Sequence, residues 1–250
     1  MHLNYNFSKN NKPVLLLIHG FLGSMEQWQQ LEYLLDNRYS ILKIDLPGHG
    51  TSPESNSPFT APDFIESLNA ILKSEHIDHI HIMGHSMGGY LGAAFAKANP
   101  KKVASLTMLN SIAGKDPQEK KLIRNRAIEL IQKHKTAYIN MAISNLFTKS
   151  ELDTYKDVID TMRIAAHSLS TQSIINSLLY MRDREGALDG LKDCNLKINY
   201  IYSLQDQIIA PNLTRTECDL LNIKGKTINC GHMSLLTNPV NILYCMHFNE

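Results

Sequence analysis

The sequence predicts an α/β fold with a mostly parallel central sheet covered by helices on both faces. Strand-like apolar runs alternate along the chain with helical patterns, which is typical of a doubly wound sheet. A chain of 250 residues is long enough to bury one large core, so we expect one core domain carrying an insertion. The predicted strands are residues 14–19, 41–45, 77–83, 103–109, 198–203 and 226–229.

Two helices beside these strands are marked by their end signals. Thr60 and Asp63 have the spacing of a capping box, which predicts a helix over residues 60–73. A second helix is predicted over residues 87–98, because Pro100 follows it closely. Small residues leave one side of this second helix thin enough to approach the central strands. They are Gly88, Gly89, Gly92, Ala93 and Ala96.

The alternation of strands and helices breaks over residues 115–186. This stretch has no convincing strand, and we expect three or four helices in it. We therefore assign residues 1–114 and 186–250 to the core and residues 115–185 to an insertion. The expected helix starts each combine a cap residue with an acid three positions on. They are Asp116 with Pro117 and Glu119, and Ser150 with Asp153.

The segment Gly84-His85-Ser86-Met87-Gly88 lies between a predicted strand and a predicted helix, which is the setting that a nucleophilic serine requires. A serine whose hydroxyl stands clear of both elements occupies a tight, strained turn, so its neighbours two before and two after need to be nearly free of side chain. Gly84 and Gly88 meet this demand. The five-residue pattern alone also arises by chance, and the strand-turn-helix context is what favours catalysis at Ser86.

Three further segments follow predicted strands in the order that serine chemistry requires. Residues 19–23 follow the first run, Asp206 follows residues 198–203, and His232 follows residues 226–229. The segments HGFLGS, DLPGHGTS, GHSMGG, LQDQIIAP and GHMSLLTNP together resemble the signatures of the α/β-hydrolase superfamily. The resemblance covers nearly the whole chain and is weakest over residues 115–186. It implies the α/β-hydrolase fold of an esterase-like serine hydrolase, with the insertion as a helical cap over the active site. Ordinary sheet-covering helices are the alternative for that insertion.

A catalytic triad of Ser86, His232 and Asp206 is the assignment that the resemblance and these positions favour. Serine is a weak nucleophile near neutral pH and needs a base, which in turn needs an orienting acid. His232 is the expected base and Asp206 the expected acid. Asp45 and Asp116 are the alternative acids, but the first suggests a turn-stabilising role and the second a helix cap. The remaining candidates, His19, His49 and His85, are expected to be structural.

Two backbone amides are expected to form an oxyanion hole. The amide of Met87 directly follows the nucleophile and lies at the start of a helix, whose positive end favours a negative oxygen. The amide of Phe21, in the loop after the first long strand, is the expected second donor.

Large apolar residues near these loops and in the insertion suggest a flexible acyl pocket, because methionine adapts to irregular ligands. Core packing is the alternative for each residue of the insertion. The candidate pocket residues are Met25, Trp28, Met141, Phe147, Met162 and Met233.

The first expected helix of the insertion is locally basic. Its cations outnumber the two acids Glu119 and Glu129, which suggests either a solvated helix face or a dock for an acidic acyl carrier protein, as in the similar pimeloyl-carrier methyl ester esterases. The cations are Lys120, Lys121, Arg124, Arg126, Lys133 and Lys135.

Composition points to a small molecule as the partner, and the resemblance implies that it is an ester. The formal net charge of +1 provides no global field for nucleic acid or an anionic membrane. No segment is suited to span a bilayer, the start lacks the pattern of a signal peptide, and a cytoplasmic location is expected. The four cysteines show no C-x-x-C spacing, so no zinc site is indicated. We expect no metal and no organic cofactor.

A serine hydrolase of carboxylic esters, with a small or medium acyl group, is the favoured function. One alternative is a carbon-carbon bond hydrolase or a lyase similar to the menaquinone-pathway synthase, although this chain lacks the arginine often found after the second glycine of that group's serine motif. Dehalogenases and epoxide hydrolases carry aspartate in place of Ser86. Another alternative is a ligand-binding receptor that retains the triad and turns over slowly.

Overall fold

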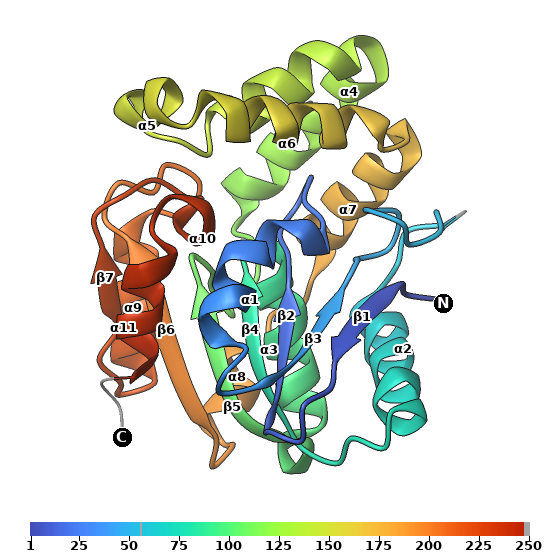
Figure 1. Ribbon diagram of the computed structural model, residues 1–250. Coiled ribbons are helices and arrows are strands. Elements are labelled where there is room, and N and C mark those ends of the chain that lie inside the picture. Colours follow the sequence, from blue (N-terminus) through green and yellow to red (C-terminus); the bar gives the residue numbers. More distant parts are fainter. Residues whose placement is uncertain (56, 248–250) are drawn as a thin grey trace.

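The protein is described by a computed structural model that covers residues 1–55 and 57–247 (Figure 1). Its centre is a seven-stranded sheet in the order β1-β3-β2-β4-β5-β6-β7, and every neighbouring pair is parallel except β1 with β3. The predicted mostly parallel sheet is therefore confirmed. The strands are β1 Tyr5–Ser8, β2 Val14–Ile18, β3 Ser40–Ile44, β4 Ile80–His85, β5 Val103–Leu109, β6 Lys197–Ser203 and β7 Lys226–Ile228.

The sequence analysis missed β1, which pairs antiparallel with β3 at the edge of the sheet. Its four residues alternate polar and aromatic side chains and are half-buried or exposed, so no apolar run marks them. The predicted strand over residues 77–83 begins later, at Ile80, because Asp78 and His79 are exposed in the preceding loop.

Helices cover both faces of the sheet (Figure 1). On one face α1 packs against α11, and on the other α3 packs against α2 and α8. The capping box of Thr60 and Asp63 is formed at the start of α2. The bounds are η1 Met25–Trp28, α1 Gln29–Leu35, α2 Ala61–Ser74, α3 Met87–Ala98, η2 Pro100–Lys102, α8 Leu188–Lys192, α9 Pro211–Leu220, α10 Ser234–Thr237 and α11 Pro239–His247.

The thin side of α3 approaches the sheet as the sequence predicts. A Cβ atom on Gly84 would lie 2.4 Å from the carbonyl oxygen of Gly88, and one on Gly88 would lie 2.2 Å from the carbonyl oxygen of Ile18. Neither backbone oxygen can move without displacing its own element. Both glycines are therefore required where β4 turns into α3.

Four helices lie between β5 and the short helix α8 in chain order, and they lie above the carboxyl end of the sheet (Figure 1). We call them the inserted helices. The expected helices are thus present, and no strand occurs among residues 115–186, all of which the structure describes. Their bounds are α4 Gln118–Ser144, α5 Lys149–Thr154, α6 Lys156–Ser168 and α7 Thr171–Asp183.

Both predicted caps of the insertion are wrong. Pro117 occupies the N-cap position of α4 without a side-chain cap, and Asp116 pairs instead with Arg124 and Arg184. Two guanidinium groups bind a buried carboxylate more strongly than the free amides of a helix end do. Asp116 therefore forms these ion pairs and does not cap α4. The cap of α5 is Thr148, which forms a capping box with Glu151, two residues before the predicted pair.

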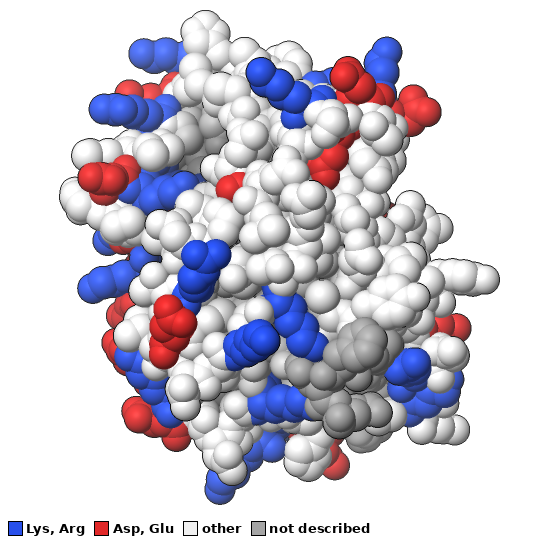
Figure 2. All heavy atoms as spheres, turned by 90° about the vertical axis from the view of Figure 1, so that its left-hand side faces the viewer, with Lys and Arg blue, Asp and Glu red and all other residues white. Residues whose placement is uncertain are grey.

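The outer surface carries charges of both signs. On the face of α5, α9 and α11, Lys and Arg side chains are scattered among acidic and uncharged residues (Figure 2). Within the described part of the chain, no helix is both long and apolar enough to cross a bilayer. The four cysteines carry free thiols; Cys218 and Cys230 are buried, and Cys194 and Cys245 are half-buried.

Candidate active site

Ser86 lies at the turn between β4 and α3 in a strained conformation. Its φ of 51° and ψ of −118° fall in a region that residues with a side chain rarely adopt. The surrounding backbone fixes this turn, because the Ser86 N–H donates to the Leu109 carbonyl at 3.0 Å and the Ser86 carbonyl accepts from the Ser111 hydroxyl at 2.7 Å. Gly20 packs against the turn, since a Cβ atom there would lie 3.2 Å from that of Ser86.

Asp206 and His232 form a buried hydrogen-bonded pair. His232 Nδ1 lies 2.7 Å from Asp206 Oδ2, and both side chains are almost completely buried. This contact fixes the ring so that Nδ1 carries a proton toward the carboxylate and Nε2 can act as a base. Asp206 is the acid that the sequence analysis favoured, whereas Asp45 and Asp116 bind elsewhere.

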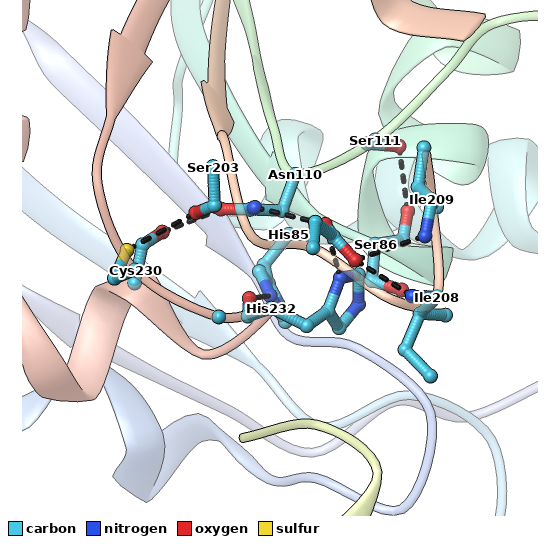
Figure 3. Close-up of polar contacts among 12 residues, drawn as sticks. His85, Ser86, Asn110, Ser111, Ser203, Ile208, Ile209, Cys230 and His232 are labelled. Atoms are coloured by element: carbon cyan, nitrogen blue, oxygen red, sulfur yellow. Dashed lines mark hydrogen bonds and ion pairs between the residues drawn. The ribbon is translucent and has the colours of Figure 1, made fainter. Parts of the chain in front are cut away.

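The carboxylate of Asp206 is held ionised by its surroundings. Its other oxygen accepts from the backbone amides of Ile208 and Ile209 at 2.8 and 2.9 Å, and the Asn110 side chain donates to Oδ2 at 3.0 Å (Figure 3). Burial alone raises the pKa of Asp206, but the charge of His232 and these hydrogen bonds outweigh it and lower the pKa below its ordinary value.

Asn110 is a residue that the sequence analysis missed. It follows β5 with a positive φ of 45°, which asparagine tolerates better than most residues, and it bridges Asp206 to the hydroxyl of Ser234. Its signal was present, because a polar residue directly after a central parallel strand lies at the edge where such sites form. The pattern did not show that its amide would reach the acid.

His85 has the structural role that was expected of it. Its Nε2 lies 3.0 Å from the carbonyl oxygen of His232, and the two rings are 4.9 Å apart (Figure 3). Burial, together with the charge of His232, lowers the pKa of His85 to about 3. His85 is therefore neutral near pH 7 and braces the loop that carries His232.

Asp45 and His19 fix the loop that contains Phe21 through hydrogen bonds. Asp45 accepts hydrogen bonds from the amides of Met25 and Thr51, which confirms its turn-stabilising role. His19 Nε2 accepts from the Leu46 amide at 2.9 Å, so this histidine also fixes the loop, as expected.

Ser86, His232 and the candidate oxyanion residue Phe21 line one cavity of about 330 Å³. The amides of Phe21 and Met87, the two candidate oxyanion donors, make no hydrogen bond to any of the described residues. Backbone donors that remain free beside a nucleophile can bind a developing oxyanion.

Only two of the six candidate pocket residues reach this cavity. Met141 of α4 and Met233, which follows His232, line its wall, and so does Met181 of α7. The cavity has further apolar walls that the sequence analysis did not assign, among them Tyr90 and Tyr138.

The other four candidates are core residues and do not line the cavity. Trp28 is completely buried and Met25 nearly so, where η1 packs on the sheet. Phe147 and Met162 are buried among the inserted helices. Apolar type and position in the chain could not distinguish these residues from Met141 and Met233, because both sets suit either environment.

The inserted helices contact the loop of His232 directly. The His232 amide donates to the Leu146 carbonyl at 2.8 Å, and the Gly231 amide donates to the buried Glu151 carboxylate at 3.1 Å. Glu151 also accepts from the Thr148 amide at 2.7 Å. The sequence analysis missed Glu151, because its capping-box pattern carries no sign of the second contact.

The cations of α4 do not form one exposed face. Lys120 donates to the Ile208 carbonyl at 3.1 Å, Arg124 pairs with Asp116, and Lys135 donates to the carbonyls of His167 and Leu169. These side chains are half-buried. The helix is therefore less available to an acidic partner than its composition suggested.

Among residues 1–55 and 57–247, no group of three or more histidine, cysteine, aspartate or glutamate side chains is arranged to hold a metal ion.

Comparisons with known proteins indicate an α/β hydrolase. The family described as alpha/beta hydrolase fold matches residues 13–239. Monoacylglycerol lipase abhd6-B of Xenopus laevis is 22% identical over 261 residues, which cover 94% of this chain and 76% of the lipase. Several other curated relatives align over only about a quarter to a third of their own length.

Solved structures share the fold over nearly the full length. A thermophilic esterase from Thermogutta terrifontis superposes with a TM-score of 0.89 at 22% identity, covering 98% of this chain and 92% of the esterase. The enol-lactonase of Burkholderia xenovorans LB400 superposes with a TM-score of 0.88 at 15% identity, covering 98% and 96%. At such identities the similarity speaks for the fold alone.

Proposed function

The chain belongs to the α/β-hydrolase fold family, and we propose that it hydrolyses carboxylic esters through an acyl-enzyme formed on Ser86. The observation that carries this proposal is the buried pair of Asp206 and His232 beside the same cavity as the strained Ser86. The esterase and the enol-lactonase that share the fold, and the lipase that is similar in sequence, act, by their names, on ester-like substrates, and this supports the same reaction class here.

In the first half-reaction, Ser86 Oγ attacks the carbonyl carbon of the ester while its proton passes to His232 Nε2. Asp206 stabilises the imidazolium through its 2.7 Å contact with Nδ1. The carbonyl oxygen becomes an oxyanion and accepts hydrogen bonds from the amides of Phe21 and Met87. Collapse of this intermediate re-forms the carbonyl and breaks the bond to the alcohol oxygen, which takes the proton from Nε2 as it leaves.

In the second half-reaction, a water molecule takes the place of the alcohol. His232 Nε2 accepts its proton as the water oxygen attacks the acyl carbon, and the same two amides hold the oxyanion. Collapse breaks the bond to Ser86 Oγ, which recovers a proton from the imidazolium. The products are the free acid and the regenerated serine.

We also propose that the inserted helices act as a cap that limits the acyl group. Much of the cavity wall comes from α4, including Met141 and Tyr138, and a cavity of about 330 Å³ suits a small or medium substrate. A free small-molecule ester is favoured over an acyl carrier protein, because Lys120 and Arg124 line the cavity and Lys135 binds backbone carbonyls, so these cations do not form one exposed docking face.

A panel of p-nitrophenyl esters of increasing acyl length tests this function. Purified protein should release nitrophenol over many turnovers, with kcat/KM rising and then falling as the acyl chain outgrows the cavity. Ser86→Ala should abolish this activity while the far-ultraviolet circular dichroism remains unchanged. Equal activity in the Ser86→Ala variant, or a single stoichiometric release without turnover, would contradict an ester hydrolase, and the second result would favour a slow-turnover receptor.

A further inference from the structure

The wall of the cavity beside Ser86 carries positive charge and no carboxylate. Lys120, Arg124 and Arg126 line the cavity from the first turns of α4, whereas no aspartate or glutamate among the described residues does so. The remaining walls are mostly apolar or uncharged.

Of these three cations, Arg124 is the one that pairs with an acid among the described residues. Asp116 is shared between Arg124 Nε at 3.2 Å and Arg184 Nη1 at 2.7 Å, so one carboxylate serves two guanidinium groups. Asp206 is already bound by His232 and two backbone amides. Lys120 and Arg126 form no ion pair with any of the described residues, so the cations that line the cavity outnumber the acids that pair with them.

Hydrogen-bond donors on these cations also remain free. Arg124 uses only Nε with Asp116, and its two terminal nitrogens donate to no atom of the described residues. Lys120 Nζ donates only to the Ile208 carbonyl, which leaves two of its three protons. Burial and, next, the charge of Arg124 lower the pKa of Lys120, so an anion placed beside it would be favoured.

These cations line the same cavity as Ser86. Arg184 stacks on Tyr90 at 3.9 Å from the ring centre, and Tyr90, one turn of α3 after Ser86, lines the same cavity. A ligand that reaches Ser86 therefore occupies the space that Lys120 and Arg124 border.

We propose that the substrates of this site are esters that carry a carboxylate, which Lys120, Arg124 and Arg126 bind while the ester carbonyl lies at Ser86. This inference rests on the proposed ester hydrolysis and names its substrate class. The carboxylate belongs to the acyl part or to the alcohol part of the ester, and guanidinium and ammonium donors recognise it in either place.

Two matched substrate pairs separate these cases. Mono-p-nitrophenyl adipate and p-nitrophenyl hexanoate have the same chain length and differ by a terminal carboxylate in the acyl part. The compound 4-(hexanoyloxy)benzoate and its methyl ester differ by a carboxylate in the alcohol part. Each kcat/KM is divided by the rate constant for hydroxide hydrolysis of the same compound, which removes differences in leaving group.

The wild type should prefer the anionic member of one pair by about tenfold or more, the effect of a charge-assisted contact in a partly buried site. Lys120→Met and Arg126→Gln should each reduce this preference several-fold. Arg126 is exposed at the cavity, so its substitution should not disturb folding. Lys133→Met is the matched control, because Lys133 is an exposed cation of the same helix that does not line the cavity. It should leave the preference unchanged.

Efficient turnover of neutral esters without an anionic preference in either pair would overturn this inference and leave the proposed function intact. A preference that persists in Lys120→Met and in Arg126→Gln would also overturn it, since other groups would then supply the recognition. Activity that is equal in the wild type and in Ser86→Ala would remove the proposed function itself, and the inference with it.

Discussion

The sheet and the inserted helices contribute different parts of the site. Loops at the carboxyl ends of the strands carry Ser86, Asp206 and His232, whereas α4 contributes much of the cavity wall, including Lys120 and Met141. The groups proposed to react are buried and held by several hydrogen bonds each, whereas most of the wall residues from α4 are half-buried or exposed, with Tyr138 buried. The comparison suggests that chemistry depends on the sheet and substrate choice on the inserted helices.

The two regions are joined at one place, the loop of His232. Leu146 and Glu151 of the insertion accept hydrogen bonds from the amides of His232 and Gly231. The position of the proposed base therefore depends on both regions. Substitutions in the sheet, at this junction and in the wall should have separable effects.

The largest effect is expected for the proposed reacting groups. Ser86→Ala or His232→Ala should lower kcat/KM by roughly 10⁴-fold or more, and Asp206→Asn somewhat less, because the three act as one unit. Steady-state kinetics with the best ester of the panel measures this. Near-wild-type activity in Asp206→Asn would reject the chosen acid.

The junction should be the next most sensitive place. In Gly231→Ala, the new Cβ atom would lie 2.5 Å from Glu151 Oε2 and 3.0 Å from the Leu146 carbonyl oxygen, so the His232 loop has to move away. A displacement of about 1 Å in such a group costs about 10²-fold in rate, and kcat should fall more than KM rises. An unchanged kcat would show that the loop tolerates the shift and that the two regions are less coupled than their contacts suggest.

Glu151→Ala tests the same junction through stability. It leaves the buried amides of Gly231 and Thr148 without their acceptor, which costs about 1–3 kcal/mol in the free energy of unfolding. Urea unfolding measures this value, and Asp153→Ala, an exposed acid of the same helix, is the matched control. Equal stability of both variants would mean that solvent replaces the carboxylate.

Substitution of two methionines of the insertion distinguishes residues of the cavity wall from residues of the core. Met141→Trp should shift the preferred acyl length toward shorter esters, because Met141 lines the cavity. Met162→Trp should leave the preference unchanged and destabilise the protein by about 1–3 kcal/mol through overpacking, because Met162 is buried away from the cavity. The ester panel and urea unfolding of both variants check this, and the reverse pattern would contradict the assigned walls.

The smallest effect concerns acid stability. Because the pKa of Asp206 is lower in the folded protein, folding binds fewer protons there, and the carboxylate contributes stability above the ordinary aspartate pKa of about 3.9. This contribution is lost as pH falls through the folded value. The stability difference between the wild type and Asp206→Asn should therefore shrink between pH 7 and pH 3. A difference independent of pH would contradict the lowered pKa.

The sheet and the inserted helices also differ in how well their structure could be predicted from the sequence. The sheet could be predicted from the apolar runs of its strands, and the turn at Ser86 from the glycines around it, because both depend on local demands of the backbone. The pairing of Asp206 with His232 could be predicted from their places after strands of the sheet. The wall of the cavity depends on which side of each inserted helix faces the sheet. Met141 and Met162 are the same residue type in neighbouring helices, and only the packing separates them.

Long-range polar partners were the other part that could not be predicted. Asp116 has the local pattern of a helix cap, but Arg184, far along the chain, binds it. Glu151 does form a capping box, yet its contact with Gly231 spans 80 residues. Local spacing describes what a residue does within its own turn and carries no information on such distant contacts.

Covalent labelling with a fluorophosphonate tests most directly whether Ser86 is the nucleophile. The reagent phosphonylates an activated serine with loss of fluoride, so intact mass and peptide mapping identify the residue. The wild type should gain one adduct, located on Ser86, and His232→Ala should label far more slowly. An adduct on another serine, or a folded wild type that hydrolyses esters yet gains no adduct, would contradict the account.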